Sequence, residues 1–383
     1  MNQMTFRYGA GLISLIAMAL GLACIRPPGQ VPPLTVAENL DAEFVVSGAD
    51  FPSALAFADD GRVFYTEKNS GRIRVIADGV LLPEPFAELA VNSAGDRGLL
   101  GIARHPDFEN NQRIYVFYTL SDSGASTADP QAVVDNRVVY FEATGNVAAG
   151  SEIFVVSLPA GAGVINVGGR IAFAADGTLF VALGDLGDGG SAQDTNTRNG
   201  KILRYTDDGR VPADNPIADS PVYAVGVRDV RALAFDPQSG RPFITERNPA
   251  GQHEINRIEA QGNLGWPQVT GKADTADQLA FKDANPAYSD PILDTGGAAP
   301  HLAGGSFNPS ARYGPDTSGE YFYAEAAKLR VLRMRLTADR AGLDSTRVFA
   351  TGFPTPITDV AFTPAGTLYV ACENAVFRIV PVR

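Results

Sequence analysis

The chain has 383 residues, of which 45% are hydrophobic, and a formal net charge of −12 at pH 7. This length and apolar content suffice for one large folded domain. The acidic balance argues against a nucleic-acid partner, because phosphate binding needs a basic surface. With two cysteines and three histidines, neither a disulfide framework nor a zinc-type Cys/His cluster is expected.

The N-terminal segment resembles a secretory signal. Arg7 precedes an apolar run over residues 9–23, which is too short and too poorly flanked for a membrane span. Cys24 follows Gly21, Leu22 and Ala23, as in a bacterial lipoprotein signal, and lipidation of Cys24 would attach the protein to a membrane. An ordinary signal peptide cleaved nearby is the alternative. Both interpretations predict export, to the periplasm or as a lipid-anchored protein of the cell envelope.

Residues 1–23 are therefore the predicted signal, residues 24–40 a Pro-rich tether, and residues 41–383 the folded domain. The domain carries a repeated pattern, clearest where Ile171 and Phe173 are followed by Gly177 and then by Phe180 and Val181. Two apolar runs around a tight glycine-containing turn are typical of a β-hairpin. Similar copies begin near residues 56, 99, 234, 305 and 361.

Six such copies favour one particular all-β fold. A small antiparallel sheet cannot bury both faces alone, but sheets stacked radially bury one another. We therefore predict a six-bladed β-propeller of four-stranded antiparallel blades. A large β-sandwich is the competing fold, and it would not require the phrase A-F…G…L-[FY]-V at least four times. Cys372 lies in an apolar strand of the last copy and is expected to be a buried small hydrophobe.

The domain contains several ordered phrases, namely GLLG…HPDF at residues 98–108, GGR at 168–170, GKILR at 200–204, VPADNP at 211–216, and a set with TE, EIN and GWP at 245–267. These phrases resemble those of the glucose/sorbosone dehydrogenase family, the soluble quinoproteins that use pyrroloquinoline quinone (PQQ). The set at 245–267 is similar to the family's TEHGP…DEIN…NYGWP. The similarity extends from about residue 45 to the C-terminus. It implies the same six-bladed propeller, with a site formed by loops on one face near the central channel.

The resemblance also implies a mechanism with three parts. A general base takes the hydroxyl proton while hydride passes to the quinone, Ca²⁺ polarises the quinone, and cationic and amide side chains hold its carboxylates. The family's base is the histidine of HxGGR, and that position is Asn166. An amide cannot accept a proton at neutral pH. Catalysis would then need another group, for which Asp185, Asp188 and His301 are the candidates.

His301 and His105 also have structural interpretations. We favour a loop or strand-start role with a structural hydrogen bond for His301, and a turn anchor within a blade for His105. Trp266, the only tryptophan, is expected to be a packing residue at a blade corner.

Cofactor-binding positions follow from the same resemblance. Arg228 stands at the arginine of the family's GxRN phrase and is the strongest single candidate for a functional residue. Asp229 replaces the asparagine of that phrase, and Asp96 stands where some members carry a cofactor-contacting glutamine. Asn248 and Pro249 are further cofactor-binding positions.

In the last blade, the family's RxRD phrase contributes two cofactor-binding arginines, whereas residues 356–359 here are PITD. The quinone would therefore meet fewer cations and more acids than in the family, which weakens the expectation of tight PQQ binding.

The calcium site is retained better. The resemblance places Ca²⁺ ligands at Glu254 and at the main-chain carbonyl of Leu264, with His253 replacing an aspartate of the family. A solvent-facing acid at a strand edge is the alternative for Glu254. The loop 185–194, which contains Asp188 and Asp194, would hold a cation or simply be a solvated turn.

Two functions from different classes remain. The first is a PQQ-dependent dehydrogenase that oxidises an aldose or related alcohol and passes electrons to an acceptor. The second is a non-catalytic propeller that binds carbohydrate or protein and retains calcium. A calcium-dependent hydrolase is a third option, for which the sequence contains no nucleophile motif. The surroundings of Arg228 discriminate between the first two: an open, cation-lined cleft favours the enzyme, and a cleft closed by Asp96 or Asp229 favours the binding module.

Overall fold

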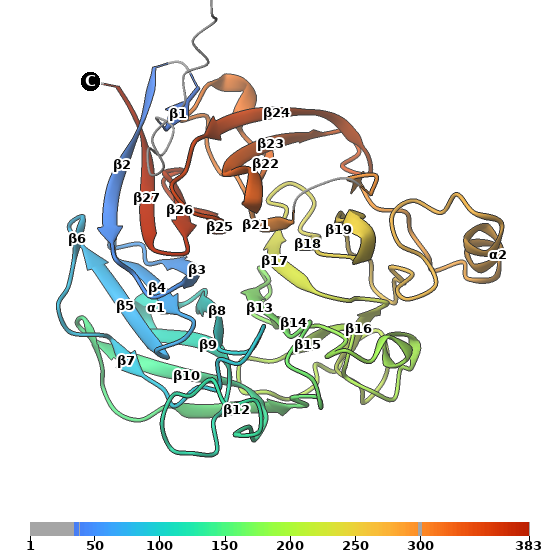
Figure 1. Ribbon diagram of the computed structural model, residues 1–383, viewed down its shortest axis with the longest axis horizontal. Helices are drawn as coiled ribbons and strands as arrows, with labels where there is room; N and C mark the ends of the chain where they lie inside the picture. Colours follow the sequence, from blue (N-terminus) through green and yellow to red (C-terminus); the bar gives the residue numbers. More distant parts are fainter. Residues whose placement is uncertain (1–33, 38, 298–300, 383) are drawn as a thin grey trace, which may run out of the picture. The chain divides into compact units, whose positions relative to one another are not determined.

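The computed structural model describes residues 34–37, 39–297 and 301–382. Six antiparallel sheets are arranged around a common axis, as the repeats predict (Figure 1). The innermost strands contact one another in cyclic order, in the sequence β3 (Pro52–Phe57), β8 (Leu99–Arg104), β13 (Gly168–Phe173), β17 (Val230–Phe235), β21 (Leu302–Phe307) and β25 (Ile357–Phe362). The predicted six-bladed propeller is confirmed.

Blades one to three follow the chain from inside to outside. Blade one adds β4 (Val63–Glu67), β5 (Arg72–Ala77), β6 (Val80–Leu81) and β7 (Ala87–Glu88). Blade two adds β9 (Arg113–Thr119), β10 (Asn136–Thr144), β11 (Val147–Ala148) and β12 (Ile153–Leu158). Blade three adds β14 (Leu179–Leu183), β15 (Lys201–Tyr205) and β16 (Val222–Val225).

Blades four to six bring the two ends of the described chain together. Blade four adds β18 (Pro242–Glu246), β19 (Glu254–Arg257) and β20 (Leu293–Asp294). Blade five adds β22 (Tyr321–Glu325), β23 (Arg330–Leu336), β24 (Leu343–Thr351) and β1 (Thr35–Val36). Blade six adds β26 (Leu368–Cys372), β27 (Ala375–Pro381) and β2 (Leu40–Ser47). Because β2 pairs with β27, the ring is closed by hydrogen bonds between the two ends of the domain.

The structure differs from the prediction in two details. Blades one, two and five contain a fifth strand. In addition, β1 lies inside the predicted tether and pairs with β24, with Thr35 opposite Thr351, and β2 begins at Leu40. The folded domain therefore starts before residue 41. The predicted signal and Cys24 lie outside the described residues.

Helices are few in the described part of the chain, namely α1 (Phe108–Asn111), α2 (Ala276–Ala284) and the short 3₁₀ turns η1 (Gly189–Gln193), η2 (Pro249–Gly251), η3 (Pro315–Thr317) and η4 (Ala326–Lys328). The Thr275 hydroxyl caps α2 by accepting from the Gln278 N–H. In the described ranges we find no helix with the length and apolar character needed to span a bilayer.

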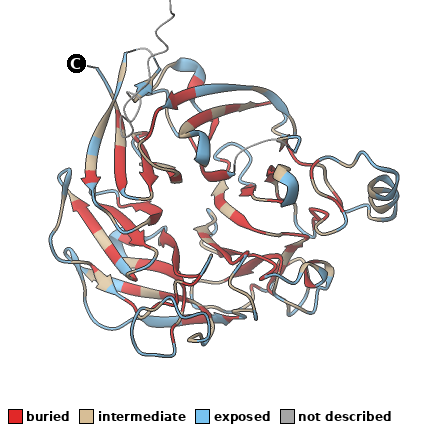
Figure 2. Cartoon of the chain, in the orientation of Figure 1, coloured by how far each residue is buried: buried red, intermediate tan, exposed pale blue. Residues whose placement is uncertain are grey.

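The hydrophobic core lies between neighbouring blades, where buried residues of adjacent sheets meet (Figure 2). Phe64 of β4 packs edge-to-face on Phe86 and Phe108, with ring centroids 5.3 and 6.3 Å apart. Cys372 is completely buried and burial raises the pKa of its thiol to about 12, which confirms the predicted packing role.

The glycines of the GLLG and GGR phrases allow two inner strands to approach closely. A Cβ atom on Gly101 of β8 would lie 2.3 Å from the carbonyl oxygen of Gly169 in β13. We expect Gly101→Ala to lower the free energy of unfolding by about 1–3 kcal/mol, because a packed interface has no room for the methyl group. Gly150→Ala is the control, since nothing lies within 4 Å of its Cβ position. Equal denaturant midpoints for the two variants would contradict this account of the phrases.

Candidate functional site

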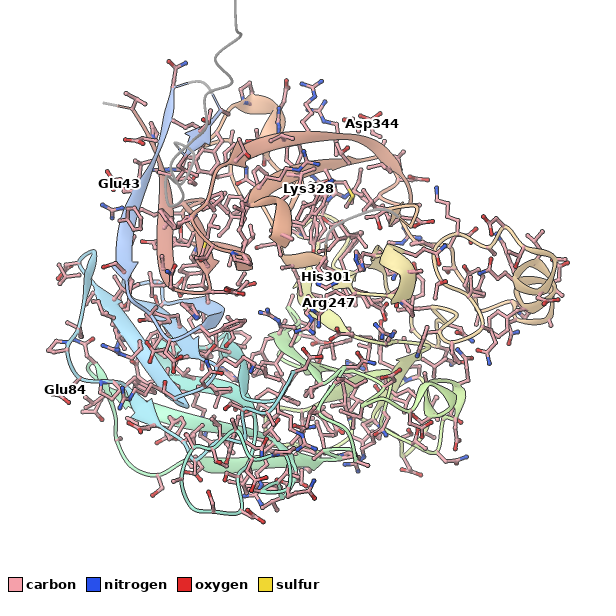
Figure 3. All side chains as sticks on the ribbon, viewed as in Figure 1. Glu43, Glu84, Arg247, His301, Lys328 and Asp344 are labelled. Atoms are coloured by element: carbon pink, nitrogen blue, oxygen red, sulfur yellow. The ribbon has the colours of Figure 1, made fainter. Side chains whose placement is uncertain are left out.

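A cavity of about 360 Å³ lies at one end of the inner strands. Its charged and titratable lining residues come from all six blades or from the loops that enter them, and are Lys68, Asp96, Arg170, Arg231, Arg247, His301 and Glu373. Arg247 follows β18 and His301 precedes β21, and the two lie close together near the centre of the ring of blades (Figure 3). Four cations in one cavity are notable in a chain whose net charge is −12.

Two of these cations belong to a charge network formed by Asp96, Asp229, Arg231 and Arg247. Asp96 Oδ1 accepts from Arg231 Nη2 at 3.0 Å and from Arg247 Nη2 at 3.2 Å. Asp229 Oδ2 accepts from Arg231 Nη2 and from Arg247 Nε, both at 2.8 Å. The network therefore joins the loop before β8 to blade four.

Burial is the main cause that raises the pKa of Asp229 to about 6, and the charge of Asp96 adds to it. Asp229 is 1% exposed, and its Oδ1 has no hydrogen-bond partner in the described part of the chain. The carboxylate is thus held by the two guanidinium groups on one side only. Its negative charge partly offsets the positive charge that Arg231 and Arg247 bring to the cavity.

Sequence reasoning did not identify Arg231 or Arg247. Arg247 stands where the family phrase TEHGP has its histidine, and this difference from the family could have marked Arg247 as a residue of the site. Arg231 carried no such signal.

The predicted base position acts as a hydrogen-bond donor. Asn166 lies beside the cavity with a left-handed backbone, φ 57°, and its N–H donates to Asp96 Oδ2 at 2.9 Å. Its side-chain Nδ2 donates to Asp185 Oδ1 at 2.8 Å. The amide is therefore oriented by a buried carboxylate but cannot take up a proton.

Neither Asp185 nor Asp188 lines the cavity in which that base would act. Asp185 is 1% exposed and also accepts from Gly187 N–H and Trp266 Nε1, both at 2.8 Å, so that both of its oxygens are occupied. Asp188 is exposed and is not among the cavity-lining residues. Of the three candidates from the sequence, only His301 lines the cavity.

Arg228 is not paired with either acid of the charge network. Its Nη1 donates to the Arg247 carbonyl at 3.0 Å, and its Cζ lies 5.2 Å from the centroid of the Trp266 ring. Asp96 and Asp229 pair with Arg231 and Arg247 instead, so the cation-lined cavity stays open. Arg228 itself lies beside this cavity rather than in its lining.

Trp266 does more than the packing predicted for it. Its indole N–H holds Asp185, and its ring lies against the Arg228 guanidinium. One side chain therefore links the predicted functional arginine with the carboxylate that orients Asn166.

Blade six contributes no cation to the cavity, as expected from the sequence. Pro356, Ile357 and Thr358 line the wall there. Arg170 extends from blade three to blade six. Its Nη2 donates to the Thr358 carbonyl at 3.2 Å, and its Nη1 lies 3.4 Å from Asp359 Oδ1.

Glu254 lies in a row of three acids on blade four, apart from the cavity lining, and both Glu254 and Glu246 of this row are buried. In the pairing of β18, β19 and β20, Glu254 stands opposite both Glu246 and Asp294. Like charges placed opposite one another are destabilising. Burial is the first cause that raises the pKa of Glu254 to about 7.

The groups around Glu254 fit a cation only in part. Its Oε1 accepts from Asn248 Nδ2 at 2.8 Å and Gly271 N–H at 2.6 Å, and its Oε2 from Asn256 Nδ2 at 2.9 Å. Within the described ranges, no three His, Cys, Asp or Glu side chains gather closely enough to hold a metal by themselves. A Ca²⁺ ion here would need neutral oxygens, such as Asn248 Oδ1, which is buried and unpartnered among the described residues, and the predicted Leu264 carbonyl.

The other predicted positions lie outside the cavity lining. Asn248 contacts Glu254 rather than the cavity, and Pro249 is exposed at the start of η2. In the loop 185–194, Asp194 Oδ1 accepts from the Asn196 N–H at 2.9 Å, which is solvated turn chemistry. His105 Nδ1 accepts from the Asp107 N–H at 3.0 Å, which confirms the predicted turn anchor.

The fold and the cavity together define a six-bladed propeller with a cation-lined pocket on its axis. The family pattern described as Glucose / Sorbosone dehydrogenase matches residues 49–380. The chain belongs to this family.

Its relatives include sugar dehydrogenases. An uncharacterized protein of Synechocystis sp. is 30% identical over 86% of this chain and 83% of its own length. Quinoprotein glucose dehydrogenase B of Acinetobacter calcoaceticus is 29% identical over 67% of this chain and 58% of its own length. The PQQ-bound aldose sugar dehydrogenase of Streptomyces coelicolor is 25% identical, with a TM-score of 0.74 over 90% of this chain and 99% of that structure.

Proposed function

We propose that the protein is a PQQ-dependent dehydrogenase that oxidises a hydroxyl group of an aldose or related alcohol and passes the electrons to an acceptor. The observation that carries this proposal is the axial cavity with four cationic side chains, in a chain of the family whose relatives include a PQQ-bound aldose sugar dehydrogenase. The N-terminal signal pattern supports export, with lipidation at Cys24 as one form of it.

The cationic side chains of the cavity are of the type that binds an anionic, carboxylate-bearing cofactor. Lys68, Arg231 and Arg247 would hold its carboxylates, since charge-assisted bonds to carboxylates are the strong ones. The buried Nε atoms of Arg228 and Arg231 have no partner in the described part of the chain, so the site keeps unused donor capacity. When bound, PQQ supplies the hydride acceptor.

The chain's own residues would do the rest. Asn166 would offer its amide to the sugar while Asp185 fixes its orientation. Arg228, whose guanidinium lies over the Trp266 ring, would supply a fixed positive charge beside the cavity. Glu254 with its amide neighbours would hold Ca²⁺ behind the site as a structural ion.

Titration of the purified protein with PQQ in the presence of Ca²⁺, followed by calorimetry, tests the proposal. We expect saturable binding, and dye reduction that depends on an aldose. Arg247→Gln should weaken PQQ binding at least tenfold, because it removes a cavity cation. Arg210→Gln is the matched control, since it removes the same charge at an 80% exposed side chain paired with Asp208.

A non-catalytic binding module is the second candidate. It is favoured by the donor role of Asn166 and by the two acids that offset the cavity arginines. Saturable calcium binding without any PQQ binding would overturn the dehydrogenase proposal and leave this candidate.

A further inference from the structure

Oxidation of an alcohol requires a proton acceptor, and the family position for it is occupied by an amide. Within the cavity lining, the side chains with a titratable oxygen or imidazole nitrogen are Asp96, His301 and Glu373. Asp96 already accepts from two arginines and from the Asn166 N–H. His301 and Glu373 are therefore the two groups left to consider.

His301 is placed to meet a ligand. It lies directly before β21, and its carbonyl accepts from the Ala326 N–H at 2.8 Å, which fixes the backbone. The side chain is exposed toward the cavity, and its ring meets His253 edge-to-face with centroids 5.2 Å apart. No hydrogen bond to its ring nitrogens is present among the described residues. A substrate hydroxyl in the cavity can therefore reach the imidazole.

The surroundings keep His301 neutral. Burial, first, and the positive charge of Arg247, second, lower the pKa of His301 from its ordinary value of 6.5, while Asp229 and Asp96 oppose the shift. At pH 7 the ring is in the form that accepts a proton. Arg231, Lys68, His253 and Glu373 are the other titratable or charged side chains around this part of the cavity.

We propose that His301 is the general base of this enzyme, in place of the histidine that Asn166 replaces. The inference rests on the proposed dehydrogenase function. In the step, the substrate O–H bond breaks and its proton passes to a ring nitrogen of His301. The adjacent C–H bond breaks and its electron pair leaves as hydride to the ortho-quinone oxidant, so that a carbonyl forms. His301 then releases its proton to the reduced oxidant, which has gained two electrons and two protons in all.

Substitution of His301 tests this role in the PQQ-loaded protein. We expect His301→Gln to lower kcat by about 10²- to 10⁴-fold while KM and PQQ affinity change little. Imidazole added to His301→Ala should restore part of the rate, which a purely structural histidine would not show. In the wild type, kcat should fall as the pH drops through a pKa below 6.5. His105→Gln, a histidine outside the cavity lining, is the matched control.

A second measurement is independent of turnover. The chain has only three histidines, so their imidazole NMR signals can be assigned by substitution. An aldose added to the PQQ-loaded protein, with Ca²⁺ and no electron acceptor, should shift the His301 signal and leave that of His105 unchanged. The inference is overturned if PQQ binds and sugar is oxidised while His301→Gln keeps its rate, or if Glu373→Gln loses it instead. Absence of PQQ binding would refute the proposed function itself.

Discussion

Asn166→His is expected to raise the rate of sugar oxidation by at most about 10²-fold, because it adds a second base to the proposed base His301, at the position where the family has one. The carboxylate needed to orient that base is already present, since Asp185 Oδ1 accepts from Asn166 Nδ2 at 2.8 Å. A histidine could donate Nδ1–H to Asp185 and present Nε2 to the substrate. The left-handed backbone at residue 166, φ 57°, is one that histidine adopts more readily than most residues.

Steady-state kinetics of the PQQ-loaded variant checks this expectation. Asn166→Gln is the control, since it changes size without adding a base and should give no gain. The double variant Asn166→His with His301→Gln should recover most of the activity that His301→Gln alone loses. A variant that binds PQQ and sugar normally but is no faster than the wild type would show that proton removal does not limit the reaction.

The propeller could be predicted because each blade is encoded locally. The hairpin phrase places an aromatic residue, such as Phe57 or Phe173, at the end of an inner strand and a glycine in the turn that follows. The repeated pattern does not predict strand β1, because β1 has only two residues and its partner β24 lies more than 300 residues further along the chain. Such a short pairing has no apolar period of its own.

The candidate site could be predicted only in part. The family phrases locate Asn166, Arg228 and Glu254, and the loss of the base is evident from residue type alone. The charge network is different, because Asp96 meets Arg231 and Arg247 across 135 and 151 residues of sequence. Which acid pairs with which arginine depends on closure of the ring. For His301 the sequence favours a structural hydrogen bond, because only the fold shows that this residue lines the cavity.

We expect Asp96→Asn to strengthen the binding of PQQ by about tenfold. In the wild type, Asp96 occupies donors of both Arg231 and Arg247, which are two of the cations available for a cofactor carboxylate. The isosteric amide can still accept from the Asn166 N–H, but it carries no charge. A hydrogen bond to a charged group contributes about 1.5–3 kcal/mol, so release of one guanidinium is worth about a factor of ten or more. Calorimetric titration with PQQ at constant Ca²⁺ measures the change.

The control for this prediction is Asp214→Asn, which changes the net charge equally at a side chain that is 76% exposed and paired with Arg204 on blade three. The second acid of the network adds a dependence on pH. Since burial raises the pKa of Asp229 to about 6, lowering the pH from 7 to 5 protonates it and removes one negative charge. Affinity for the anionic cofactor should therefore rise more over this range in the wild type than in Asp229→Asn, where the titration of His301 remains. Equal PQQ affinities for the wild type, Asp96→Asn and Asp214→Asn would mean that the network arginines do not contact the cofactor.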